Sequence, residues 1–128
     1  MIFRDYGRTG ASVSVIGFGG MRFRDQNDVD GCASLVKAAY DAGITYFDTA
    51  PGYGKSESLF GAAFKEMNRT RAQRPFYVST KSGKSAPSDI RRDFENSLRR
   101  MNLDSIDFYH MWYVLSLDEY RGRKARGA

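Results

Sequence analysis

Apolar segments recur along the chain, and each is followed by a stretch with the spacing of a helix. The first apolar segment, residues 12–21 (SVSVIGFGGM), alternates and ends in glycines, which is typical of a strand followed by a tight turn. Three further segments predict strands: residues 44–50, 75–81 and 105–112. The stretches between them predict helices over residues 27–43, 56–68 and 86–102, and a last helix begins near Ser116.

The strand segments repeat at a constant interval. Val15, Tyr46, Tyr77 and Phe108 mark the four strands, and each lies 31 residues after the one before. Strand-helix-strand units of this length suit right-handed parallel crossovers. We therefore expect an α/β fold with a parallel sheet of about four strands and outer helices, in βα units that begin near residues 15, 44, 75 and 105.

A β-hairpin is expected ahead of the first βα unit. Residues 1–14 place Gly7 and Gly10 around a turn between two short apolar runs. The whole of residues 1–128 is expected to form one domain.

Helix ends are marked by a small set of polar residues and glycine. Ser56, Ser88 and Ser116 are candidate N-caps, because a serine oxygen can accept a hydrogen bond from the first turn of a helix. Gly43 is the expected stop of the helix before it.

Composition is that of an ordinary globular protein, with 41% hydrophobic and 27% charged residues. No apolar run approaches the roughly 18 residues of a membrane span, so no membrane partner is expected. The charged N-terminus (MIFRDYGRTG) is unlike a signal peptide, which favours a cytoplasmic location. Cys32 is the only cysteine, so neither an internal disulfide nor a cysteine-built metal site is possible.

The formal net charge is +5, with much of the excess in residues 68–74 and at the C-terminal end. No nucleic-acid-binding module accompanies these residues, so solvated surface charge is the favoured interpretation and no nucleic-acid partner is expected. Attraction of an anionic cofactor is a milder alternative.

Polar residues that can take part in catalysis lie near the ends of the predicted strands. Asp48, Lys81 and His110, the only histidine, end the second, third and fourth strands, and Tyr53 follows in the loop after Asp48. The carboxyl ends of parallel strands share one rim, where such folds build their sites. Each residue alone has a structural explanation, such as a turn aspartate, a solvated lysine or a satisfied histidine, but their joint placement favours a site.

These side chains fit proton transfer to a carbonyl oxygen. A tyrosine hydroxyl ordinarily has a pKa near ~10, and a neighbouring ammonium favours its ionised form. An aspartate paired with that lysine offsets the cost of burying the ammonium. His110 would orient a substrate carbonyl. No side chain can supply a hydride, so a reduction would require a nicotinamide cofactor.

At these residues the sequence resembles the aldo-keto reductase superfamily. The resemblance rests on GFGGM, YFDTAPGYGKSE, VSTKSG and SLRRMNLDSIDFYHMW, and it covers essentially the whole chain. GFGGMRF and HMWYVLSLDEY resemble more particularly the members that continue into a C-terminal iron-sulfur, ferredoxin-like segment, although no cluster-binding cysteines are present. The resemblance implies a (β/α)8 TIM barrel and reduction of aldehydes or ketones with NADP(H) or NAD(H).

Site roles follow from the same resemblance. It implies Tyr53 as general acid, Lys81 as the cation that tunes it, Asp48 as the partner of Lys81, and His110 as the group that orients the carbonyl. Gly20 and Met21, with Asp48, would border the nicotinamide end of the cofactor, and Trp112 would wall the substrate pocket.

The chain supplies four of the eight strands that a TIM barrel needs, in 128 residues rather than ~250. We therefore expect the N-terminal half of a barrel, a truncated chain that is weakly active or inactive alone. Its open barrel edges should favour self-association. The alternative is a non-catalytic half-barrel used for binding or oligomerisation, its catalytic residues a relic.

Overall fold

The computed structural model describes residues 1–128 and contains six strands and four α-helices. In chain order they are β1 (Phe3–Asp5), β2 (Ser12–Ser14), β3 (Phe18–Gly19), α1 (Val29–Asp41), β4 (Tyr46–Asp48), α2 (Ser56–Met67), β5 (Tyr77–Ser82), α3 (Pro87–Met101), β6 (Phe108–Met111) and α4 (Leu117–Ala125). Short 3-10 turns follow β3 (Gly20–Arg22) and α2 (Asn68–Thr70). None of the helices has the length and apolar character that crossing a membrane requires.

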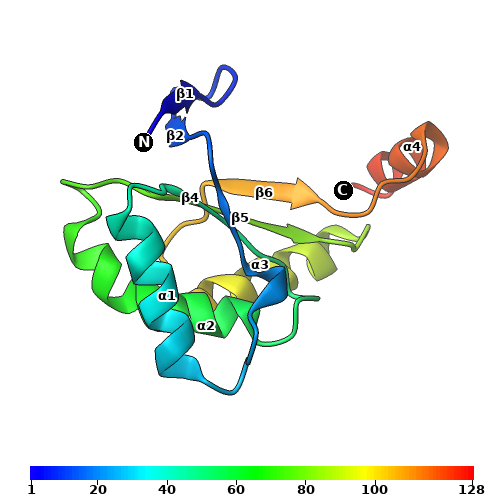
Figure 1. Ribbon diagram of the computed structural model, residues 1–128. Coiled ribbons are helices and arrows are strands. Elements are labelled where there is room, and N and C mark those ends of the chain that lie inside the picture. Colours follow the sequence, from blue (N-terminus) through cyan, green and yellow to red (C-terminus); the bar gives the residue numbers. More distant parts are fainter.

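The main sheet has four parallel strands in the order β3-β4-β5-β6. Helices α1, α2 and α3 lie together on one side of it, and the antiparallel β1-β2 hairpin lies on the other side (Figure 1). The sheet is not closed, because β3 and β6 are its two edges. The expected fold class is confirmed: an α/β half-barrel preceded by a β-hairpin.

The constant 31-residue interval matches the strand register at only one of three junctions. Tyr46 pairs with Tyr77, but Phe108 pairs with Ser79. Val15 is not in a strand of the sheet, which begins at Phe18. The first strand segment divides because Ser14 and Thr45 exchange two hydrogen bonds of 2.9 Å between side-chain oxygen and backbone N–H, which tie the end of the hairpin to the chain before β4.

One of the three predicted serine N-caps is confirmed and two are wrong. The Ser116 hydroxyl accepts a hydrogen bond from the Glu119 N–H at 3.1 Å. Ser56 is instead the first residue of α2, and its buried hydroxyl bonds that of Thr49 at 2.8 Å. Ser88 lies inside α3, which starts at Pro87, a position where no backbone N–H is needed.

Aromatic rings form the core between the sheet and the helices. Phe47 of β4 meets Phe60 and Phe64 of α2, and Phe76 just before β5, edge to face at centroid distances of 5.7–6.0 Å. All four are fully buried. Such edge-to-face pairs add to the free energy gained by burying the rings. The core fixes α2 against β4, and so positions the loop between them.

A buried carboxylate links α2 to its neighbours. Glu57 is 2% exposed, and its Oε1 accepts hydrogen bonds from the hydroxyls of Thr80 in β5 (2.9 Å) and Ser97 in α3 (2.7 Å). Its Oε2 accepts one from Arg100 at 3.0 Å. Buried charges are stable only when paired and hydrogen-bonded, so this residue joins three elements at one point.

We expect Glu57→Ala to lower the free energy of unfolding by roughly 2–3 kcal/mol, because two buried hydroxyls and a guanidinium lose their acceptor. Urea denaturation followed by circular dichroism measures the loss. Glu66→Ala is the matched control, since Glu66 sits on the same helix but is exposed and pairs with Lys37 on the surface. Equal losses in the two variants would contradict a special role for Glu57.

Candidate active site

An ion pair joins the ends of β4 and β5. Lys81 Nζ donates to both carboxylate oxygens of Asp48, at 2.8 Å and 2.7 Å. The Ser79 hydroxyl donates a further hydrogen bond of 2.6 Å to Asp48 Oδ1. Lys81 is only 8% exposed, so its ammonium has little water and relies on this carboxylate.

Strand register explains why these residues meet. Asp48 pairs with Ser79 in the parallel ladder, and Lys81 lies two residues further along β5. Because strand side chains alternate between faces, Ser79 and Lys81 project from the same face as Asp48.

Tyr53 lies in the loop between β4 and α2, close to this pair. Lys81 Nζ is 5.1 Å from the centroid of its ring, within the range of a cation–π contact. A turn closed by the hydrogen bond from the Tyr53 N–H to the Ala50 carbonyl (3.0 Å) brings the ring back over the strand ends. The structure therefore places three of the four predicted catalytic residues together.

Gln26, which the sequence analysis did not single out, holds the tyrosine loop. Its side-chain amide donates to the Tyr53 carbonyl at 3.1 Å and accepts from the Lys55 N–H at 2.7 Å. Asn27 adds a bond of 2.7 Å from the Lys55 ammonium. Gln26 stands in an irregular loop between β3 and α1, where no periodic pattern marks a residue as important.

His110 is placed beside Lys81 by the pairing of β5 and β6, in which the two residues are register partners. They therefore share a face of the sheet, and His110 is half-buried there. Tyr109 precedes it, so its side chain points to the other face, where its ring packs against Phe94 of α3. Burial, with a smaller contribution from Asp93, raises the pKa of Tyr109 to about 12, so this phenol stays protonated at neutral pH.

Trp112 lies against the tyrosine loop. Its ring meets that of Tyr53 edge to face at 6.0 Å, and a Cβ added at Gly52 would come within 3.1 Å of the indole. A cavity of about 360 Å³ opens here, within the range of small-molecule sites. It is lined by Pro51, Gly52, Lys81, Ser82, Gly83, Lys84, Asp93 and Trp112.

Gly20 and Met21 follow β3 at the same rim. Gly20 is buried under α2, where an added Cβ would lie 2.2 Å from Ser56 Oγ and 2.3 Å from a ring carbon of Phe60. Packing alone therefore requires a glycine at this position. Met21 is exposed and leaves an apolar surface near the end of β3.

Comparison with known proteins gives a consistent picture. A sequence model described as the aldo/keto reductase family matches residues 15–115. L-galactose dehydrogenase from Arabidopsis thaliana is 34% identical over 119 residues, which cover 84% of this chain and 36% of that protein. A probable voltage-gated potassium channel subunit beta from Oryza sativa subsp. japonica is 32% identical over 119 residues, with the same two coverages.

Solved structures agree with these relatives. The crystal structure of a thermostable aldo-keto reductase in complex with the inhibitor epalrestat superposes with a TM-score of 0.76 at 28% identity. The match covers 99% of this chain and 49% of that one. The chain thus spans about half the length of this solved structure and about a third of the length of the curated relatives.

Gly54 offers a test of how tightly the tyrosine loop is held. It has φ +65°, and a Cβ there would lie 2.4 Å from Gln26 Oε1. We expect Gly54→Ala to cost about 1 kcal/mol for the left-handed backbone and about 1 kcal/mol more for the disturbed Gln26 hydrogen bonds.

Gly7→Ala is the matched control, because Gly7 has φ +58° with no atom within 4 Å of an added Cβ. Urea unfolding measures the loss of unfolding free energy in each variant. The difference between the two losses is the contribution of the contact with Gln26. The same loss at both positions would mean that Gln26 does not constrain the loop.

Proposed function

Because this chain belongs to the aldo/keto reductase family, we propose that it forms the proton-donating half of an active site that reduces aldehydes or ketones to alcohols. The observation that carries the proposal is the Lys81–Asp48 pair, with Lys81 nearly buried, held beside the Tyr53 ring. An ammonium next to a phenol stabilises the phenolate that remains after proton transfer, which gives a nearly buried lysine a role in catalysis.

Each residue has a separate task in this proposal. The Tyr53 hydroxyl gives its proton to the carbonyl oxygen as that oxygen gains negative charge. The Lys81 ammonium balances the charge left on the phenolate, and Asp48 keeps the ammonium in place. His110 donates a hydrogen bond to the carbonyl oxygen, and Trp112 forms one wall of the cavity that receives the substrate.

The reduction also needs a hydride, which a nicotinamide cofactor, NADP(H) or NAD(H), would supply to the carbonyl carbon. The residues at the rim fit such a group. The Asp48 side chain is 34% exposed, so it can accept a hydrogen bond from a ribose hydroxyl. Met21 provides an exposed apolar surface at the end of β3, whereas Gly20 is buried against α2.

A second candidate function is non-catalytic. The 32% identical relative is described as a probable potassium channel subunit, which points to use of this fold for binding another protein. On this alternative the half-barrel binds or assembles, and the four site residues carry no chemistry.

We expect Tyr53→Phe to lower kcat for aldehyde reduction by at least ~10²-fold, because the variant keeps the ring but loses the transferable proton. Oxidation of NADPH and of NADH, followed at 340 nm with a panel that includes sugar aldehydes, measures this in the chain and in any longer protein that contains it. Tyr77→Phe is the control, since Tyr77 is the first residue of β5 and lies towards the opposite end of that strand from Lys81.

Equal rates in Tyr53→Phe and the unsubstituted protein would contradict the assigned proton donor. Absence of cofactor oxidation with every aldehyde, in the chain and in a longer protein, would favour the binding alternative.

Self-association is the second part of the proposal. The edge strand β6 leads into an exposed apolar patch made by Val114, Leu115, Leu117 and Tyr120. A second copy fits this edge, because each copy offers one free β3 edge and one free β6 edge of the same parallel sheet. Two four-stranded sheets together supply the eight strands of a barrel.

We expect light scattering coupled to size exclusion to show a mass of about twice the monomer, rising with concentration, since unpaired strand edges favour association. Leu117→Lys, within the patch, should shift the equilibrium towards monomer. Leu35→Lys on α1 is the control, because Leu35 is about as exposed but lies on the outer helical layer. A monomer at all concentrations would contradict the proposal.

A further inference from the structure

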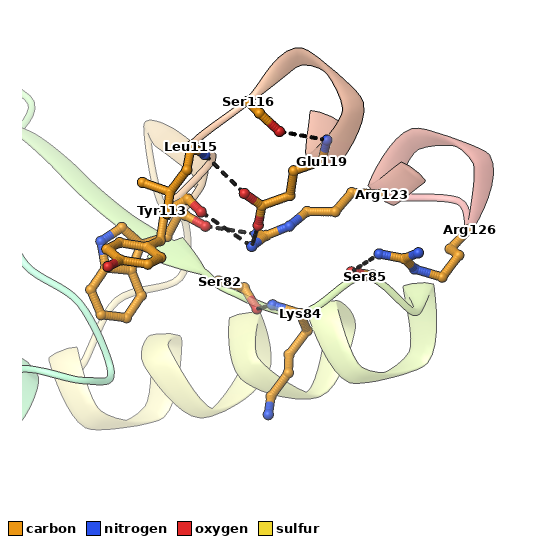
Figure 2. A network of polar contacts seen from close by, with 10 residues as sticks. Ser82, Lys84, Ser85, Tyr113, Leu115, Ser116, Glu119, Arg123 and Arg126 are labelled. Atoms are coloured by element: carbon orange, nitrogen blue, oxygen red, sulfur yellow. Dashed lines mark hydrogen bonds and ion pairs between the residues drawn. The ribbon is translucent and has the colours of Figure 1, made fainter. Parts of the chain in front are cut away.

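One buried residue ties helix α4 to the loop before it, and Arg126, directly after the helix, adds a hydrogen bond of 3.2 Å to the Ser85 hydroxyl (Figure 2). Arg123 is 8% exposed and is the only buried residue of this helix. Its guanidinium reaches back to the loop between β6 and α4, as Figure 2 shows. It donates to the Trp112 carbonyl at 2.6 Å and to the Tyr113 carbonyl at 3.3 Å.

Glu119 completes this attachment from the first turn of α4. One carboxylate oxygen accepts a hydrogen bond from Arg123, and the other accepts one of 2.9 Å from the Leu115 N–H. The Leu115 N–H and Arg123 lower the pKa of Glu119, so the carboxylate is charged at neutral pH. Two side chains of α4 thus bind the backbone of three residues in the preceding loop.

The loop that they bind is in a conformation that it would not keep alone. Tyr113 has φ +61°, in the left-handed region that costs a residue with a Cβ about 1–2 kcal/mol. Tyr113 is also largely exposed, so packing of its own ring does not supply that free energy. The Trp112 N–H still donates a hydrogen bond of 2.9 Å to the Ser82 carbonyl of β5. The left-handed conformation at Tyr113 then turns the chain away from the sheet.

We propose that Arg123 is a positioning residue for substrate selection. By binding the carbonyls of Trp112 and Tyr113 from α4, it fixes the loop and holds the Trp112 indole as one wall of the cavity that Lys81 also lines. The contacts of the indole agree with a fixed ring. A Cβ atom added at Gly52 would lie 3.1 Å from the indole, and one added at Gly83 would lie 3.8 Å from it. The indole also meets the Tyr53 ring edge to face.

An arginine suits this position better than a lysine. Its planar guanidinium carries several N–H donors in a fixed geometry, so one side chain can serve two carbonyls and a carboxylate at once. A lysine ammonium has no such planar fork and is more strongly hydrated, which makes burial more costly. Loss of the guanidinium would free the loop to leave the left-handed conformation and let the indole move.

The consequence for substrates rests on the proposed function, because a wall matters only if the cavity receives a carbonyl compound. A fixed indole limits the width of the cavity, whose lining also includes Lys81. A mobile indole would raise KM for substrates that depend on contact with it, while the Lys81–Asp48 pair stays intact.

Trp112 is the only tryptophan of the chain, so its fluorescence reports on this wall without any turnover. The experiment compares the unsubstituted chain with Arg123→Met, Arg123→Lys and Arg121→Met, using emission wavelength and quenching by acrylamide. Arg121→Met is the matched control, since Arg121 is on the same helix, is exposed, and lies 3.6 Å from Asp118. Far-UV circular dichroism checks that the sheet and the inner helices remain folded.

We expect Arg123→Met to shift emission to longer wavelength and to raise the quenching constant, Arg123→Lys to give an intermediate change, and Arg121→Met to give none. The inference is overturned if Arg123→Met leaves the emission unchanged, or if Arg121→Met changes it equally. It is also overturned if Arg123→Met unfolds the whole chain, because the residue would then serve the fold as a whole rather than one loop.

Kinetics separate this inference from the proposed function. In a form that turns over, Arg123→Met should raise KM for a bulky aromatic aldehyde more than KM for acetaldehyde. If no form turns over but the fluorescence changes as expected, the proposed function fails and the positioning role stands. If turnover depends on Tyr53 but the fluorescence does not respond, the positioning role fails alone.

Discussion

The pair formed by Lys81 and Asp48 is the interaction on which the site depends. An ammonium that is nearly buried is stable only if a carboxylate stays within hydrogen-bond distance, and both oxygens of Asp48 do so. The pair can exist because β4 and β5 are parallel neighbours whose carboxyl ends lie side by side. The register of two strands therefore determines where charge can sit beside the Tyr53 ring.

Polar contacts outside this pair keep the surrounding elements in place. Glu57 joins α2 to β5 and α3 from within the core. Its contact with β5 is the hydroxyl of Thr80, the residue before Lys81. Gln26 holds the loop of Tyr53 through a hydrogen bond to the Tyr53 carbonyl. Both residues use side chains to join segments that are distant in sequence, so the loops at the rim are held by more than their own turns. Such support is what a preorganised site requires.

The sequence was sufficient to predict the sheet, the hairpin and the placement of Asp48 and Lys81 together, because strand ends follow from local patterns and parallel topology brings them to one rim. It was insufficient for residues whose role depends on a distant partner. No sequence pattern distinguishes Glu57 from the other acidic residues, yet its partners are Thr80, Ser97 and Arg100. Arg123 looked like part of a solvated basic tail. The cap at Ser56 was wrong for a similar reason, since a tertiary contact with Thr49 took its hydroxyl.

The hairpin adds a temporal constraint to this architecture. The ring of Tyr6, the residue after β1, packs on the ring of Phe108, the first residue of β6, with 4.3 Å between ring centroids. These two residues are separated by most of the chain, so the hairpin cannot complete its contacts until β6 has been synthesised. Contacts of such long sequence separation are slow to form. The hairpin is thus made before the strands of the sheet, yet it completes its packing only after the last of these six strands is in place.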